Sequence, residues 1–168
     1  MIGDIEEFIK QFHGQRRRTQ WLVDVIPESK ADWRPWPDEP SPAEIVCRLA
    51  ATHLMYATVT AHNYWYVDDF EGWTTTWERA TEYFAEKTEA ALDLLRPLPD
   101  SVLMEKRHKL DGNPPTSAWR FLMAMLDAEI SGRMQLDNYL MLLNVHRPSL
   151  SSFTLESVRE ALAQMKEH

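Results

Sequence analysis

Apolar residues recur three and four positions apart through most of the chain, a spacing typical of amphipathic α-helices. The pattern predicts long helices over residues 4–26, 41–66, from 74–76 to just before Pro97, and over 117–144. A shorter periodic segment covers residues 154–166. Since no alternating apolar run is long enough to indicate a strand, the chain is predicted to be all-α.

Residues at the predicted helix ends support these limits. Asp4 suits the N-cap of the first helix, and Pro27 stops that helix. Ser41 precedes the second helix, with Glu44 three residues later at the spacing of a capping box. Pro42 occupies the first helical position, where a missing N–H costs nothing.

Proline-rich and polar segments separate the helices. Residues 31–42 form a proline-rich loop that we expect to be stiff and packed down by Trp33 and Trp36. Residues 98–116 are polar and predict a loop with room for a short extended piece. Four long helices with such connections predict an up-down-type four-helix bundle with a short extra C-terminal helix, in one domain over residues 1–168.

Composition and net charge indicate the class of protein and the kinds of partner that it is expected to bind. The 168 residues are 44% hydrophobic and 26% charged, as in ordinary globular domains. A net charge of −8 disfavours nucleic acid and anionic membrane surfaces as partners. We expect a cytoplasmic protein, because the chain shows no signal-peptide pattern, no span-length apolar run and one cysteine, Cys47. Seven tryptophans point to a bulky helical core or to a dimer face.

The six histidines do not have the spacing of a metal site. No two of them stand three or four residues apart. His53 and His62 are nine residues apart on one predicted helix, so they point in opposite directions. With Leu49 and Ala57 one turn to either side, His53 is interpreted as a core or interface residue. We therefore expect no metal and no cofactor.

Several charged or polar residues fall on or near apolar helix faces. Glu129 lies on the apolar stripe of the fourth helix, Arg133 follows four residues later, and Arg48 is close to the stripe of the second helix. Arg16 and Thr19 interrupt the stripe of the first helix. Two interpretations stay open: a polar pocket inside the bundle, lined by Arg48, Glu129 and Arg133, or an ion-pair network that fixes helix register.

Three segments carry a resemblance to a known family. They read WRPWP, SPAEIVCRLAATHL and AMLDAEISGRMQLDNYLMLLNV, and they resemble the DinB/YfiT-like superfamily over nearly the whole chain. The third segment is similar to the family pattern H-E-x-x-H-R-G-Q-L-x-x-Y-L. The resemblance implies a four-helix bundle that is usually dimeric, a divalent metal held by three histidines, and activities that include thiol-dependent S-transfer and isomerisation.

At the three ligand positions this chain departs from the pattern. The resemblance assigns them to Arg48, Ala128 and Gly132, while Glu129 and Arg133 match their neighbours. Alanine and glycine side chains have no donor atom, and the arginine repels a cation. We expect Arg48 to fill the volume left on the fourth helix and to pair with Glu129 in place of the metal.

Two classes of function follow. One is a DinB-like protein without metal-dependent activity, acting as a binding or interaction module and forming a homodimer. The other is an enzyme with a metal-free polar pocket formed by Arg48, His53 and Glu129, similar in activity to a thiol transferase. Its small-molecule ligand would be held by Arg48, His53, Glu129 and Arg133. An open cavity that exposes Arg48 and Glu129 would favour the enzyme, and a filled one the interaction protein.

Overall fold

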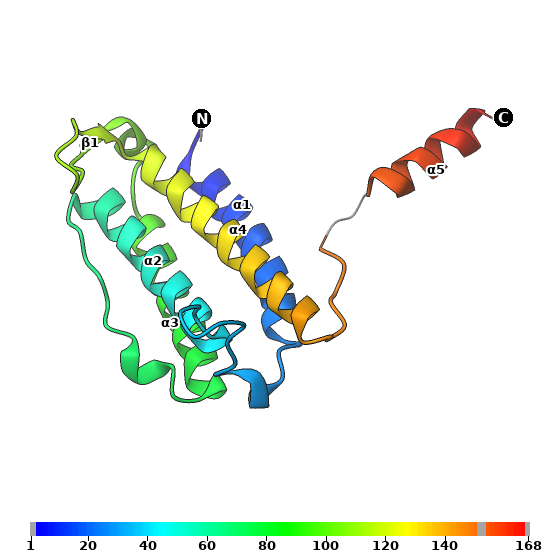
Figure 1. Ribbon diagram of the computed structural model, residues 1–168. Coiled ribbons are helices and arrows are strands. Elements are labelled where there is room, and N and C mark those ends of the chain that lie inside the picture. Colours follow the sequence, from blue (N-terminus) through cyan, green and yellow to red (C-terminus); the bar gives the residue numbers. More distant parts are fainter. Residues whose placement is uncertain (1–2, 151–153, 167–168) are drawn as a thin grey trace.

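Four long helices form a bundle (Figure 1). The computed structural model describes residues 3–150 and 154–166. The elements are α1 (Ile5–Val23), η1 (Glu28–Lys30), α2 (Pro42–His62), η2 (Glu71–Trp73), α3 (Trp77–Leu95), η3 (Asp100–Met104), β1 (Lys106–Arg107), β2 (Thr116–Ser117), α4 (Trp119–Leu142) and α5 (Leu155–Lys166). The predicted all-α bundle with a short C-terminal helix is confirmed.

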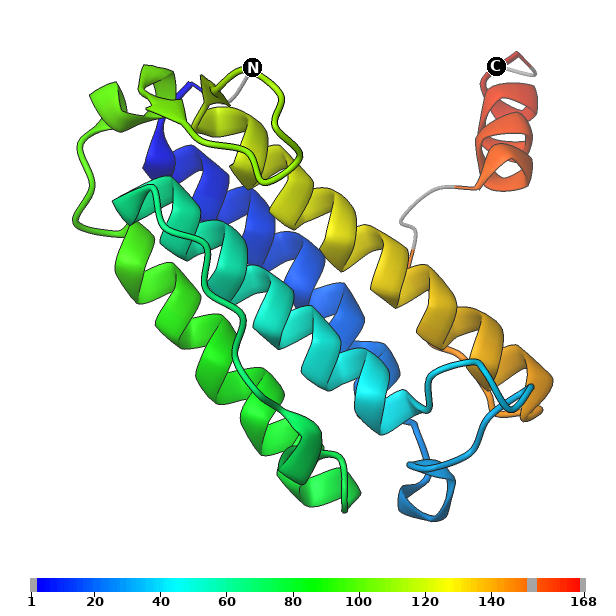
Figure 2. The same ribbon diagram turned by 60° about the vertical axis from the view of Figure 1, so that its left-hand side comes forward.

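The helices do not simply alternate in direction. α2 and α3 run parallel, since Cys47 lies beside Ala80 and, further along both helices, His53 lies beside Thr88. α1 and α4 run the opposite way (Figure 2). The connection over residues 63–76 makes this possible: extended, it reaches roughly 45 Å at ~3.3 Å per residue, whereas α2 is roughly 31 Å long. The predicted bundle is thus present, with α2 and α3 as a pair of consecutive long helices that run parallel.

Local capping sets the helix ends. The Asp4 side chain accepts a hydrogen bond from the backbone N–H of Glu7, and Ser41 with Glu44 forms the predicted capping box. α2 ends four residues earlier than expected, because Asn63 adopts a left-handed conformation (φ 53°) that closes the helix. The first and fourth helices are also a few residues shorter than predicted.

The segment after α3 combines a short 3₁₀ helix and a two-stranded hairpin. β1 and β2 pair antiparallel, with Lys106 opposite Ser117. This confirms the predicted loop with a short extended piece. In the loop before α2, Trp33 packs edge-on against Tyr139 at a centroid distance of 5.4 Å, but Trp36 is 65% exposed. The expectation that both tryptophans pack down is right only for Trp33.

α5 presents its apolar side chains to solvent. Its N-terminus is capped by Thr154, whose Oγ1 accepts a hydrogen bond from the Ser157 N–H at 3.1 Å. Its exposed apolar side chains are Leu155, Val158, Leu162 and Met165. In the described parts of the chain, no helix combines the length and apolar character needed to cross a membrane.

Candidate functional site

A polar cluster crosses the middle of the bundle, and each of the four long helices contributes one side chain to it. The residues are Thr19 from α1, His53 from α2, Thr88 from α3 and Glu129 from α4. His53 and Glu129 have no exposed surface, and Thr88 is 4% exposed. Because buried polar groups are costly unless they find partners, the contacts among these four side chains determine how well the cluster is stabilised.

The imidazole of His53 lies at the centre of this cluster. Its Nε2 is 3.0 Å from Glu129 Oε2, and its Nδ1 is 3.0 Å from Thr88 Oγ1. Thr19 donates its hydroxyl hydrogen to the other carboxylate oxygen, Oε1. His53 Nε2 and Glu129 Oε2 form no hydrogen bond despite this separation, so the contact between them is electrostatic.

Arg16 adds a positive charge at the edge of the cluster. Its guanidinium carbon lies 3.5 Å from the centroid of the Phe84 ring. Burial lowers the pKa of Arg16, while the charge of Glu129 acts in the opposite direction. For Glu129, burial alone would raise the pKa, but the contacts with His53 and Thr19 and the charge of Arg16 together hold it below its ordinary value. Glu129 is therefore a carboxylate at neutral pH.

Aromatic rings enclose the imidazole. Phe12 meets it edge-on, with ring centroids 5.0 Å apart and planes at 89°, and Phe84 lies on another side with centroids 6.3 Å apart. These rings keep water away and lower the local dielectric constant, which strengthens the polar contacts inside. The same rings leave no opening from the solvent to His53.

Arg48 is not part of this cluster. Its side chain is exposed and lines a surface groove together with Asp68 and Asp69 of the long connection. Five residues separate it from His53, which is a rotation of about 140° around α2. The expected pairing of Arg48 with Glu129 is therefore wrong: His53, Thr19 and Arg16 surround the carboxylate instead.

Leu49, and not Arg48, occupies the volume beside the small residues of α4. A Cβ atom built at Gly132 would lie 2.6 Å from both terminal carbons of Leu49, closer than real side-chain atoms approach. Ala128, one turn earlier, has no donor atom, and Arg48 is turned away. The three positions that the resemblance assigns to metal ligands therefore do not present the donor atoms that a metal needs. Among the described residues, no group of three or more His, Cys, Asp or Glu side chains is placed to hold one.

Arg133 borders the cluster without pairing with Glu129. It donates a hydrogen bond to Gln15 Oε1 at 2.6 Å and so ties α4 to α1. Burial lowers the pKa of Arg133, and the charge of Glu129 opposes this. Of the four residues that the sequence suggested for one pocket, the structure joins only His53 and Glu129 directly.

Thr19, Thr88 and Arg16 were missed as partners of Glu129 and His53. The sequence did carry a signal for two of them, because Arg16 and Thr19 interrupt the apolar stripe of α1. A polar residue on a core-facing stripe requires a buried partner. Thr88 gives a weaker signal, since a threonine on an apolar stripe is common in helices.

Within the cluster, the hydroxyl of Thr88, the imidazole of His53 and the carboxylate of Glu129 contact one another in that order. Such a chain of groups can transfer a proton. Thr88 borders a groove of about 390 Å³ between α1 and α3, which Arg16 and Arg17 also line. Its hydroxyl is nevertheless almost fully covered, and His53 and Glu129 are fully covered. A substrate therefore has no route to the imidazole unless the helices separate.

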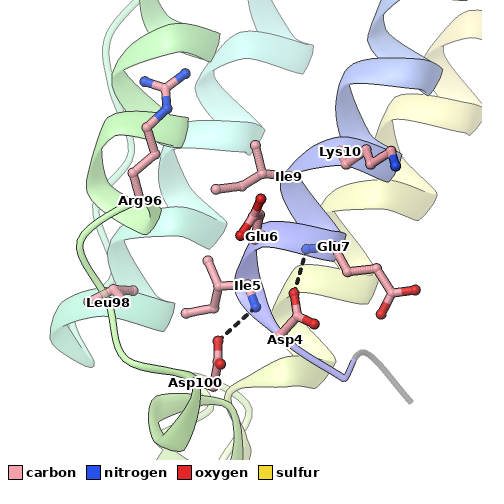
Figure 3. Close-up of a pocket in the computed structure, with 9 residues that line it drawn as sticks. All are labelled: Asp4, Ile5, Glu6, Glu7, Ile9, Lys10, Arg96, Leu98 and Asp100. Carbon is pink, nitrogen blue, oxygen red and sulfur yellow. Dashed lines mark hydrogen bonds between the residues drawn. The ribbon is translucent and has the colours of Figure 1, made fainter.

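A wider hollow of about 870 Å³ lies at one end of the bundle, between the start of α1 and the end of α3 (Figure 3). Two of its acidic residues, Asp100 and Asp4, cap the start of α1. Asp100 accepts a hydrogen bond from the N–H of Ile5 at 3.0 Å, and Asp4 accepts one from Glu7. Arg96 is paired with Glu89. The contacts of Asp4 and Asp100 cap α1, and the Arg96 pair lies on α3, so these three side chains are engaged within the chain.

Comparison with known proteins identifies the fold. The model of the DinB superfamily matches residues 11–130. A DinB-like protein from Bacillus cereus superposes with a TM-score of 0.73 at 14% identity, covering 89% of this chain and 99% of that one. A DinB-like protein from Bacillus subtilis gives 0.70 at 15% identity, covering 88% and 99%.

A third solved structure is more distant. YfiT from Bacillus subtilis, described as a probable metal-dependent hydrolase with an unusual four-helix bundle topology, gives a TM-score of 0.57 at 13% identity, covering 81% of this chain and 87% of that one. At these identities the structures show a common fold. No curated protein matches the sequence of this chain.

Proposed function

Since the chain belongs to the DinB superfamily but has no metal donor at the family's ligand positions, we propose that it is a non-catalytic interaction protein that acts as a homodimer. The observation that carries the proposal is the filled centre of the bundle. Leu49 occupies the space beside Gly132, and His53 and Glu129 are sealed from solvent.

This arrangement favours an interaction protein over a metal-free enzyme. Such an enzyme would need Arg48, His53 and Glu129 in one accessible pocket, whereas Arg48 lines a different, outer groove. The buried pair of His53 and Glu129 then fixes the relative rotation of α2 and α4. A shift or rotation of either helix would leave a buried charge without its partner.

The dimer proposal rests on the two apolar faces of α4. One face enters the core, and a second one points outward. The outer stripe consists of Met123, Ile130, Met134 and Met141, which lie within about 40° of one another at 100° per residue. Met134 is 61% and Met141 54% exposed, while Met123 and Ile130 are partly buried, so the exposed part of the stripe lies toward the end of α4. An exposed apolar stripe on a helix typically marks an interaction surface.

A second copy of the chain is the occupant that best suits this stripe. α4 has 24 residues. A strip roughly 36 Å long and about 20 Å wide, covering α4 and the neighbouring side of α1, offers about 700 Å², close to the standard ~800 Å² per partner. Trp21 on α1 adds a further exposed ring. Two-fold packing would cover the same stripe on both copies at once.

Light scattering tests this proposal directly. We expect a particle of twice the 19.7 kDa chain mass at micromolar concentration. The double variant Met134→Glu/Met141→Glu should be monomeric with unchanged helix content, because buried charges would face each other in the dimer. Met104→Glu is the matched control: Met104 is equally exposed but lies in η3, outside the stripe, and should leave the dimer intact. A monomeric wild-type chain would contradict the proposal.

Metal loading tests the non-catalytic part separately. After incubation with zinc or nickel and dialysis, we expect well below one equivalent of metal per chain by elemental analysis, because affinity needs several correctly placed donors. Retention of one equivalent in the wild type would overturn this part without affecting the dimer proposal.

A further inference from the structure

We propose that a cavity between the end of α2 and the start of α4 binds a small planar anion, namely an aromatic carboxylate or sulfonate. The cavity measures about 410 Å³, within the ~300–1,000 Å³ range of small-molecule sites. Its walls include the rings of Tyr56, Trp65 and Phe121. This site is separate from the buried cluster and from the outer stripe, so it goes beyond the proposed function.

The three rings form a fixed apolar wall. The centroids of Trp65 and Phe121 are 5.5 Å apart with planes at 84°, and Tyr56 lies 6.4 Å from each of them. The edge-to-face contacts of Trp65 with Phe121 and with Tyr56 restrict the orientations of these rings. Ala124 leaves space between the rings and α4 because its side chain is a single methyl group. The space suits a flat apolar body.

Two hydrogen bonds from the hairpin side hold this wall in place. Trp65 Nε1 donates to the backbone carbonyl of His108 at 2.9 Å, and the His108 N–H donates to Asn63 Oδ1 at 2.8 Å. They join the long connection after α2 to the segment after β1. A cavity that is already formed requires little ordering when a ligand enters, which favours binding.

The charge at the rim selects an anion. Arg120, Lys109 and Asp111 line the cavity. Asp111 is already engaged, since Asn113 donates to its two carboxylate oxygens from the backbone N–H at 3.1 Å and from Nδ2 at 2.6 Å. Lys109 is close enough to help lower the pKa of Asp111, after the Asn113 contacts. Arg120 forms no ion pair within the described part of the chain.

An aromatic anion satisfies both parts of the site. Its ring would pack against Trp65 and Phe121, while its carboxylate or sulfonate would accept paired hydrogen bonds from the guanidinium of Arg120. A neutral aromatic molecule would use only the rings, and an inorganic anion only the arginine. The combination therefore predicts selectivity for molecules that carry both features.

Titration calorimetry with 2-naphthoate and its neutral analogue 2-naphthalenemethanol tests the proposal. We expect naphthoate to bind about tenfold or more tightly than the alcohol, because the charge-assisted contact is lost in the alcohol. Arg120→Ala should abolish this preference while leaving the binding of the alcohol unchanged. Arg17→Ala, an exposed cation on α1, is the matched control and should change neither.

Filling the cavity tests its location. Ala124→Phe should remove binding of both molecules, with circular dichroism showing that the helices are retained. If that variant fails to fold, the smaller change Ala124→Leu and the surface change Arg120→Ala still decide the question. The proposal is overturned if naphthoate does not bind at millimolar concentration, if both molecules bind equally well, or if a folded Ala124→Phe protein binds as the wild type does.

Discussion

The imidazole of His53 and the carboxylate of Glu129 meet 3.0 Å apart at a point where neither side chain has any exposed surface. The contact joins α2 to α4 across the centre of the bundle. Thr19 and Thr88 extend it to the other two helices. These four polar side chains thus fix how the four helices are aligned with one another inside an otherwise apolar core.

Removing one member of this pair should be costly. Glu129→Ala or His53→Ala leaves a buried polar partner behind, and such a change typically costs about 3–5 kcal/mol of unfolding free energy. The double variant should cost less than the sum of the two single changes, because both orphaned groups disappear together. Denaturant unfolding followed by circular dichroism measures all three values.

Arg48 provides the control for this experiment. Because it is exposed, Arg48→Ala should change the unfolding free energy by no more than about 0.5 kcal/mol. A loss of several kcal/mol in Arg48→Ala, or strict additivity in the double variant of His53 and Glu129, would contradict the structure.

Glu129 should also make stability dependent on pH in the acid range. Its pKa in the folded state lies below its ordinary value of 4.5, so the unfolded chain binds a proton more readily than the folded one. The stabilisation is therefore complete above the unfolded pKa and is lost as the pH falls through the folded pKa. We expect the unfolding free energy to decrease between about pH 6 and pH 3, and Glu129→Gln to lack this component.

Urea unfolding at several pH values checks this sign. Other carboxylates also titrate in the range, so the difference between wild type and Glu129→Gln is the quantity to compare. A difference that grows as the pH falls would contradict the lowered pKa of Glu129.

Features that depend on residues close together in the sequence were predicted better than contacts between residues far apart in the sequence. The capping box of Ser41 and Glu44 depends on residues three positions apart, and it forms as expected. The pairing of Arg48 with Glu129 depended on how α2 is rotated against α4, which no local pattern specifies. The position of His53 on the same helix, about 140° away, supplies the partner instead.

Helix direction shows the same limit. Residues 63–76 are long enough to join either antiparallel or parallel helices, so the pattern of apolar positions is compatible with both. The choice depends on contacts between distant residues, such as Tyr83, whose hydroxyl donates to Asp68 at 2.7 Å and anchors the connection against α3. These contacts become visible only in three dimensions.

Cys47 should be chemically inert in the folded protein. Its side chain is fully buried, and burial raises the pKa of the thiol to about 12. Since the thiolate is the reactive form, a thiol reagent such as Ellman's reagent should not modify the native chain, but should modify one thiol per chain in denaturant. Rapid modification under native conditions would show that the α2–α3 interface opens easily.

The contact between Leu49 and Gly132 gives the last prediction. A methyl group added at Gly132 would collide with both terminal carbons of Leu49, which is itself buried in the core. Gly132→Ala should therefore destabilise the protein by about 1–3 kcal/mol through overpacking, although alanine is the better helix former by roughly 0.5–1 kcal/mol. Gly14→Ala is the matched control: it is also in a helix, with no atom within 4 Å of the added Cβ, and should be stabilising.

A substitution of Leu49 tests whether the cost of Gly132→Ala comes from the collision between the added methyl group and the Leu49 side chain. Leu49→Ala alone should cost about 2–5 kcal/mol, because it opens a cavity beside Gly132. In the double variant Leu49→Ala/Gly132→Ala the added methyl group enters that cavity, so the loss should be smaller than the sum of the two single losses. Urea unfolding at one protein concentration compares the four chains. If Gly132→Ala stabilises the protein as Gly14→Ala does, the Leu49 side chain moves aside at little cost, and a larger side chain would be tolerated at position 132.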